Sequence, residues 1–248
     1  MIRAIAYLIV VTVSTILRGG IVIAAAYLRV KNRPDGVYDR QGRRWAREVL
    51  WASGVKVRTR GMEHVPDGQP VVYVGNHQSF FDIMTIMSTV PGTVRFVAKK
   101  ELAKIPVFGR ALTSLGHILI DRQNLTRAFD AYEKAAVAVR EGMSAVVFAE
   151  GTRSRTGEFL PFKKGPFVFA IASRVPVVPF YCAGTFTILP KGKMVVRPRP
   201  VTLLFGEPIP TEGLTYDDRE ALLKKTRTTI EGLRATAREL GDIQPDET

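Results

Sequence analysis

The sequence has a single cysteine, Cys182, and three histidines among its 248 residues. One cysteine excludes an intramolecular disulfide and is typical of proteins of a reducing compartment. The scattered histidines have no cysteine partners at metal-ligand spacing, so we expect no metal and no cofactor. The Gly-x-Ser-x-Gly pattern that presents a nucleophilic serine is also absent, as are internal repeats and low-complexity linkers.

Acidic residues are few, with 23 Asp and Glu against 36 Lys and Arg and a formal net charge of +13. The excess is uneven, because residues 1–60 hold twelve Lys and Arg but only three acids. Such a basic protein could bind nucleic acid. Here, however, the basic region adjoins the most apolar part of the chain. We therefore expect an anionic phospholipid membrane as the partner, and no nucleic acid.

Two uncharged runs, at 4–17 and 19–28, flank Arg18. Fourteen helical residues reach only about 21 Å, short of the roughly 30 Å hydrocarbon core. One helix over 4–28 would be long enough but would hold Arg18 in lipid at a cost of about 2.5–3.5 kcal/mol. We therefore expect a hairpin of two short helices that break at residues 18–20, with a single span as the alternative.

The segment after these runs is strongly basic. The alanines at 24–26 could be a signal-peptide cleavage site, but the Lys and Arg cluster that follows is typical of the cytoplasmic side. Residues 38–51 indicate a basic helix whose Trp45 and Trp51 suit a membrane interface, although a merely solvated basic face is the alternative. We expect residues 1–53 to anchor the chain to the cytoplasmic face of the cell membrane, and residues 54–248 to form one domain.

Short β-branched runs alternate with helical patterns in this second part. The expected strands are residues 55–60, 71–75, 94–98, 117–120, 145–149, 175–180 and 201–205. The expected helices are residues 81–89, 125–140, 167–173 and 217–240. Alternation of this kind predicts an α/β fold with a mixed, largely parallel central sheet of about seven strands covered by helices.

The segment at 76–82, Asn-His-Gln-Ser-Phe-Phe-Asp, holds a histidine and an aspartate five positions apart. A histidine held by a carboxylate can take a proton from a hydroxyl near neutral pH. Residues five apart on one helix point about 140° away from each other. His77 must therefore lie in the turn and Asp82 in the first turn of the next helix. The bland alternative is a capping box of Ser79 and Asp82.

Polar segments follow several predicted strands, at the edge where α/β sheets gather their sites. These segments contain His77 and Asp82, then Asp121 and Arg122, then residues 150–154, Glu-Gly-Thr-Arg-Ser. Arginine binds phosphate in a bidentate manner. A base-like pair beside such a basic group predicts a substrate with both a hydroxyl and a phosphate.

Four blocks together resemble the glycerolipid acyltransferases typified by 1-acylglycerol-3-phosphate (lysophosphatidic acid) acyltransferase. They lie at 76–82, 116–122 (Gly-His-Ile-Leu-Ile-Asp-Arg), 148–154 (Phe-Ala-Glu-Gly-Thr-Arg-Ser) and 175–180 (Val-Pro-Val-Val-Pro-Phe). Two positions depart from the family pattern. Ala149 stands where proline is usual, and His117 stands where a small or apolar residue is usual.

The resemblance implies transfer of an acyl group from acyl-CoA or acyl carrier protein to the free sn-2 hydroxyl of 1-acylglycerol 3-phosphate. His77 would be the general base, oriented by Asp82, with no acyl-enzyme intermediate. The residues implied to bind the acceptor are Arg122, Glu150, Gly151, Thr152 and Arg153. Lys104 and Lys163, with Lys99 and Lys100, could add phosphate contacts or lie on a solvated face.

Two other functions fit the sequence. One is the same chemistry on glycerol 3-phosphate, another lysolipid or a glycolipid. The other is a non-catalytic lipid-binding protein, which the presence of His77, Asp82 and Glu150 disfavours.

Overall fold

The computed structural model describes residues 2–193 and 195–243. Within these residues seven strands form one sheet in the order β1-β7-β6-β2-β5-β3-β4. Neighbouring strands are parallel except for the antiparallel pair of β6 and β7. The strands are β1 (Val57–Arg60), β2 (Val72–Gly75), β3 (Val94–Lys99), β4 (Ile118–Ile120), β5 (Ser144–Phe148), β6 (Val177–Ala183) and β7 (Val201–Phe205). The predicted mixed, largely parallel sheet is confirmed.

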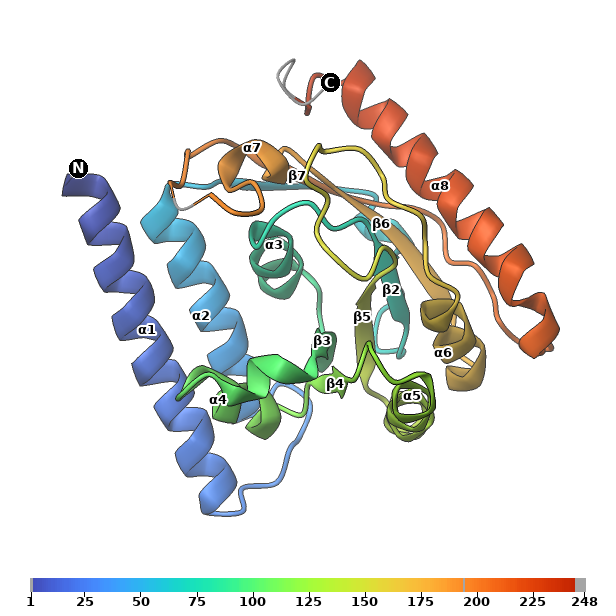
Figure 1. Ribbon diagram of the computed structural model, residues 1–248, viewed down its shortest axis with the longest axis horizontal. Helices are drawn as coiled ribbons and strands as arrows, with labels where there is room; N and C mark the ends of the chain where they lie inside the picture. Colours follow the sequence, from blue (N-terminus) through green and yellow to red (C-terminus); the bar gives the residue numbers. More distant parts are fainter. Residues whose placement is uncertain (1, 194, 244–248) are drawn as a thin grey trace.

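Helices cover both faces of this sheet (Figure 1). The α-helices are α1 (Ile2–Tyr27), α2 (Val37–Ser53), α3 (Phe81–Thr89), α4 (Phe108–Ser114), α5 (Leu125–Arg140), α6 (Gly165–Ser173), α7 (Thr185–Ile188) and α8 (Arg219–Glu239). Three 3₁₀ turns occupy Met62–His64, Lys100–Lys104 and Tyr216–Asp218. The short helices α4 and α7 are absent from the sequence-based prediction.

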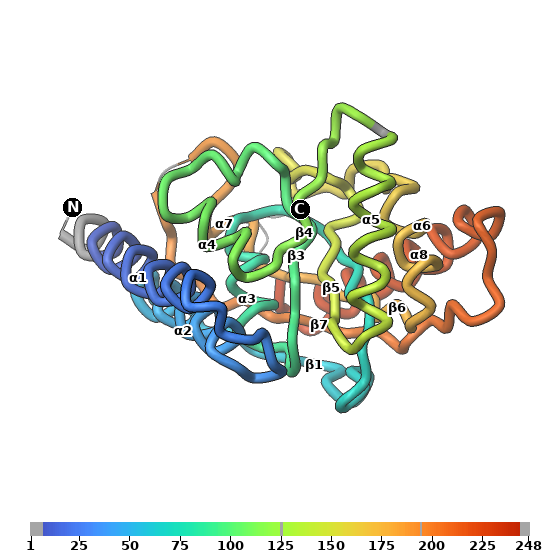
Figure 2. Tube along the Cα trace, turned by 90° about the horizontal axis from the view of Figure 1, so that it is seen from below, coloured from blue at the N-terminus to red at the C-terminus, as the bar shows by residue number. Residues whose placement is uncertain are grey.

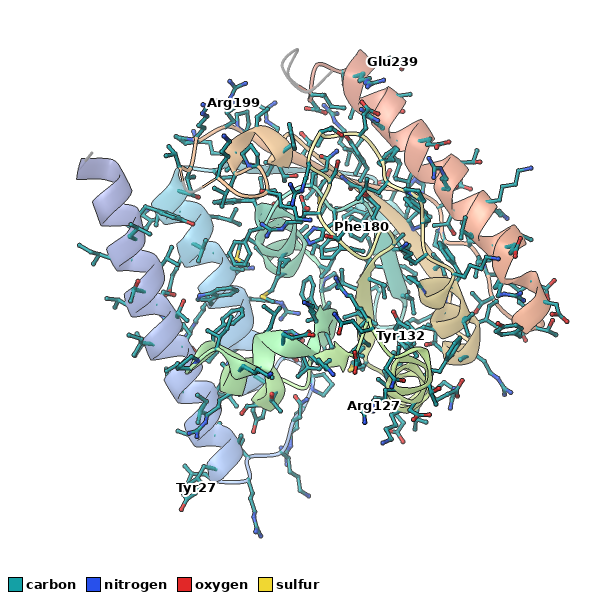
Figure 3. The ribbon with its side chains drawn as sticks, viewed as in Figure 1. Tyr27, Arg127, Tyr132, Phe180, Arg199 and Glu239 are labelled. Carbon is teal, nitrogen blue, oxygen red and sulfur yellow. The ribbon has the colours of Figure 1, made fainter. Side chains whose placement is uncertain are left out.

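Alternate side chains of a strand point to opposite faces of the sheet. In the central strands both sets of side chains are buried. In β2, Val72 and Val74 belong to the core formed with α5, α6 and α8, whereas Tyr73 belongs to the core beside α3. Figure 3 shows Phe180 of β6 in the middle of the molecule, while Tyr27 projects from the end of α1. Strands buried on both faces are expected when helices cover both sides of a parallel sheet.

The N-terminal hairpin with a break at residues 18–20 is wrong, because α1 is continuous through Arg18 and both following glycines. The chain turns back only at 28–36, and α1 and α2 lie side by side in both views (Figures 1 and 2). Arg18 needs no break because α2 neutralises its charge. Its Nε donates to the Glu48 carboxylate at 3.2 Å, and its Nη1 donates to Gln41 Oε1 at 3.2 Å.

One of the two glycines that suggested a break, Gly19, instead serves packing. A Cβ atom on Gly19 would lie 3.3 Å from the Val107 side chain and 3.4 Å from that of Ala111 in α4. Glycine inside a helix costs only about 0.5–1 kcal/mol relative to alanine, which close contact with α4 can offset. Part of α1, Tyr7–Tyr27, is long and apolar enough to cross a membrane by length and composition, with a mean hydropathy of 2.1.

The two tryptophans of α2 have different surroundings. Trp51 is 77% exposed, as expected of an interfacial residue. Trp45 instead faces the interior, where its Nε1–H donates to Thr15 Oγ1 at 3.0 Å and its ring meets that of Phe80 edge-on at 6.3 Å. Trp45 is thus half-buried between α1 and Phe80 and does not share the exposure of Trp51.

Candidate active site

The strand β2 delivers the chain to the site through two residues that fix its end. A Cβ atom on Gly75 would lie 2.4 Å from the Phe180 ring, so a larger residue cannot stand there. The Asn76 side chain accepts the Cys182 backbone N–H at 2.8 Å, which extends the pairing of β2 with β6 beyond the last strand residue. The loop that carries His77 therefore starts from a rigid position.

His77 and Asp82 are in direct contact, with 2.8 Å between Nδ1 and Oδ2. His77 lies in the loop and Asp82 in the first turn of α3, as their spacing predicts. Asp82 is fully buried. Its Oδ2 also accepts the backbone N–H groups of Gln78 at 2.7 Å and Ser79 at 2.8 Å, while its Oδ1 accepts the Thr185 hydroxyl. Asp82 thus holds both the histidine ring and two loop amides before α3, whereas the N-cap residue of this helix, Phe80, has no side-chain cap bond.

These contacts decide which nitrogen of His77 is free. The Asp82 carboxylate accepts hydrogen bonds from all its partners. In the neutral imidazole Nδ1 must therefore carry the hydrogen that is donated to Asp82. The lone pair on Nε2 is then available, and this atom has no hydrogen bond to the described residues. The ring stacks on Phe148 with centroids 4.0 Å apart and planes 11° from parallel. The ring is therefore held by a hydrogen bond at its edge and an aromatic ring at its face.

The backbone of His77 is also held, by the loop that follows β5. The Glu150 carboxylate accepts the His77 N–H at 2.9 Å, and the Ser154 N–H donates to the His77 carbonyl at 2.8 Å. The second oxygen of Glu150 accepts the Leu160 N–H at 2.9 Å. Sequence reasoning expected Glu150 to bind substrate. The structure instead places it 1% exposed, with both oxygens bonded to the backbone.

Burial raises the pKa of Glu150 to about 7, although the bonds from the His77 and Leu160 amides lower it and the nearby Asp82 charge raises it. Desolvation penalises the charged form of a carboxyl group. Glu150 thus holds the histidine loop, but its buried carboxyl group ionises less readily than an exposed one.

A cavity of about 320 Å³ extends from His77 into the space beside α1, α2, α3 and α4. Its lining is largely apolar and includes Ile83, Met87, Phe96, Val97, Leu112 and Phe148. Thr15, Arg18, Gly19 and Val22 of α1 also line it, so the N-terminal helix forms part of the wall. The site therefore joins a proton-accepting nitrogen to a space suited to a hydrocarbon chain.

Basic side chains gather where this cavity meets His77. Arg122, Thr152 and Arg153 line it, as expected of acceptor-binding residues, and so do Lys99 and Lys191. Arg122 donates to the carbonyl of Gly151, whose φ of +69° places it in a left-handed turn. Lys104 and Lys163 do not line the cavity. Lys100 instead pairs with Asp121.

Lys191 is a candidate functional residue that sequence reasoning missed. Its Nζ donates to Thr152 Oγ1 at 2.9 Å and to the Arg153 carbonyl at 3.3 Å. An isolated bridge between Ser79 and Pro190 brings it to the histidine loop. From the sequence, the only signal was that Lys191 follows β6, the strand beside β2. The bridge that brings Lys191 to the site joins segments that are over a hundred residues apart in the chain.

The family model described as Acyltransferase matches residues 56–183. The chain belongs to this acyltransferase family. It is 37% identical over 196 residues to a 1-acyl-sn-glycerol-3-phosphate acyltransferase of Limnanthes douglasii, a match that covers 78% of this chain and 69% of that protein. It is 38% identical over 193 residues to human 1-acyl-sn-glycerol-3-phosphate acyltransferase alpha, covering 73% of this chain and 65% of that protein.

The fold of this family member also matches a solved structure. The crystal structure of the 1-acyl-sn-glycerophosphate (LPA) acyltransferase PlsC from Thermotoga maritima superposes with a TM-score of 0.77 at 28% identity. The match covers 94% of this chain and 95% of that one. It therefore includes the N-terminal helices as well as the sheet.

The pKa of Glu150 makes a prediction about stability. A carboxyl pKa raised from 4.5 to about 7 on folding means that the folded state binds more protons between these pH values. The contribution of Glu150 to the free energy of unfolding is then greatest below pH 4.5 and is lost as pH rises through about 7. Because Glu150→Gln cannot ionise, the wild type should lose stability relative to this variant by about 3 kcal/mol over that range. Urea unfolding of both proteins at several pH values measures the difference. A constant difference between pH 4.5 and 7 contradicts the assignment.

Proposed function

We propose that the chain transfers an acyl group from acyl-CoA or acyl carrier protein to the sn-2 hydroxyl of 1-acylglycerol 3-phosphate, giving phosphatidic acid. The observation that carries this proposal is the position of His77, between an apolar cavity and a cluster of basic side chains. The names of the related acyltransferases support the same acceptor. No cofactor takes part in the proposed reaction.

In this reaction the free Nε2 of His77 accepts the proton of the acceptor hydroxyl as its oxygen bonds to the thioester carbonyl carbon. The bond from that carbon to sulfur then breaks, and the departing thiolate takes the proton back from the imidazolium. Asp82, whose two oxygens accept four hydrogen bonds, stabilises the imidazolium through Nδ1–H. One positioned base thus serves both proton transfers.

The two substrates would occupy the two parts of the site. The acyl chain fits the apolar cavity, where the gain is roughly 0.8 kcal/mol for each buried methylene. The acceptor phosphate fits among Arg122, Arg153 and Lys191, which line the same cavity and belong to, or bond with, the loop whose Ser154 N–H holds the His77 carbonyl. Arginine and lysine bonds to phosphate are charge-assisted and therefore stronger than neutral ones. Holding both substrates beside one base would supply much of the acceleration.

We also propose that residues 1–53 hold the enzyme on the cytoplasmic face of the cell membrane. Five apolar residues of α1 are between 51% and 58% exposed, namely Leu8, Ile9, Val13, Ile16 and Leu17. The polar side of α1, which carries Arg18, pairs with α2. A helix with an exposed apolar side next to a basic segment can lie in an anionic lipid surface.

The base assignment predicts that His77→Ala lowers kcat by about 10²- to 10⁴-fold, the usual contribution of general-base catalysis. Acyl transfer from a radiolabelled acyl-CoA to lysophosphatidic acid measures it. Lipid association, measured by vesicle sedimentation, should not change. His64→Ala is the matched control, since His64 lies outside the cavity, and should retain normal turnover. Near-normal turnover by His77→Ala would overturn the assignment.

The phosphate assignment predicts that Lys191→Ala raises KM for lysophosphatidic acid about tenfold, because a hydrogen bond to a charged group contributes roughly 1.5–3 kcal/mol. Lys193→Ala, an exposed neighbour outside the cavity, should leave KM unchanged. Steady-state kinetics should include glycerol 3-phosphate as a second acceptor. An unchanged KM in Lys191→Ala, or a preference for glycerol 3-phosphate, contradicts the proposed acceptor site.

The membrane assignment predicts that replacing both Val13 and Ile16 by glutamate reduces co-sedimentation with vesicles of phosphatidylcholine and phosphatidylglycerol by about tenfold. Val137→Glu places the same charge at a 46% exposed position on α5 and should not reduce it. Full co-sedimentation of the double variant would rule out α1 as the contact surface.

A further inference from the structure

Two largely buried side chains in the wall of the apolar cavity, an amide and an imidazole, each have a nitrogen with no hydrogen-bond partner among the described residues. Gln41 of α2 is 7% exposed and His117, just before β4, is 8% exposed. Both line the cavity that leads from His77. Neither belongs to the reacting pair, and His117 stands at a position where the family pattern predicts a small or apolar residue.

The orientation of the Gln41 amide follows from its partner. Arg18 Nη1 lies 3.2 Å from Gln41 Oε1. A guanidinium group only donates hydrogen bonds, so the amide must present its oxygen to Arg18. The NH₂ group of Gln41 is then left as a donor, and the described residues offer it no acceptor.

The tautomer of His117 is decided in the same way. The backbone N–H of Phe96 donates to His117 Nδ1 at 3.0 Å, so the hydrogen of the neutral ring is on Nε2. Burial, with a smaller effect from the Arg95 charge, lowers the pKa of His117 to about 3. The ring is therefore neutral at physiological pH, and its Nε2–H has no acceptor among the described residues.

The other polar groups of the cavity wall nearby are already paired. Thr15 Oγ1 donates to the Val11 carbonyl and accepts the Trp45 N–H. Arg18 directs Nε and Nη2 to the Glu48 carboxylate. Gln41 and Gly42 of α2 line the main cavity together with Leu115 and His117, and Gly42 and His117 also line a second, small cavity, so α2 and the segment before β4 share this part of the wall. This part of the wall therefore has hydrogen-bond donors, on Gln41 and His117, that lack acceptors among the described residues.

We propose that Gln41 and His117 form a subsite for an oxygen atom carried on the acyl chain, and that the enzyme therefore accepts oxo-acyl thioesters. The inference rests on the proposed acyl transfer. A keto oxygen accepts two hydrogen bonds and donates none, so it matches this pair of donors better than a hydroxyl group does. A plain methylene chain in the same place leaves both donors unpaired.

The distance of this subsite from the reacting atoms sets where the oxygen must lie. A row of rings leads from His77 to Phe148, then to Phe96 and then to His117, with successive centroid distances of 4.0, 6.4 and 5.6 Å. His117 is thus three rings along from the base. The oxygen lies on the body of the chain and not beside the thioester.

The test is a competition between two acyl-CoA donors of equal length, one saturated and one with a keto group, with lysophosphatidic acid as acceptor. The keto position is moved along the chain in a series of donors, and mass spectrometry measures the ratio of the two products. His117→Phe and Gln41→Met should each lower the preference for the keto chain about tenfold, at one region of the chain only. Because the ratio reports active molecules alone, partial unfolding of a variant does not affect it.

His64→Phe is the matched control, since it makes the same substitution at a histidine outside the cavity and should keep the wild-type ratio. The hydroxy-acyl donor should fall between the keto and the saturated donor. A ratio that neither His117→Phe nor Gln41→Met changes at any keto position overturns the subsite, even though transfer continues. The absence of transfer from every donor overturns the proposed function itself, and the subsite with it.

Discussion

The structure of the site depends on the buried carboxylate of Asp82. It accepts hydrogen bonds from the His77 ring, from two backbone amides of the loop and from the Thr185 hydroxyl that follows β6. A buried charge is tolerated only when such partners satisfy it. The Asp82 carboxylate therefore closes the loop and fixes the tautomer of the histidine.

The sheet brings the remaining parts of the site to this carboxylate. The neighbouring strands β2, β5, β3 and β4 are parallel, so their carboxyl ends lie at one edge and carry His77, Glu150, Lys99 and Arg122 respectively. The helices α1 to α4 enclose an apolar cavity beside that edge. Because α1 lines the cavity and also exposes apolar side chains, the proposed lipid contact and the proposed substrate site would share this helix.

Local patterns in the sequence predicted the strands, because strands depend on short-range periodicity. They also predicted the His77–Asp82 contact, because it depends on the length of one turn. They failed where distant segments interact. Arg18 suggested a helix break, yet Glu48 on α2 neutralises it. Glu150 suggested a ligand for substrate, yet backbone amides surround it. Lys191 reaches the site only through a bridge between Ser79 and Pro190. No local pattern carries information on such pairings.

Nitrogen-15 NMR of the histidine rings tests most directly the claim that Asp82 leaves Nε2 of His77 free to accept a proton. With only three histidines, each ring can be assigned by single substitution. We predict that neutral His77 carries its hydrogen on Nδ1, whereas His117 carries it on Nε2. A His77 ring protonated on Nε2 in its neutral form would contradict the claim, because that nitrogen could not then act as the base.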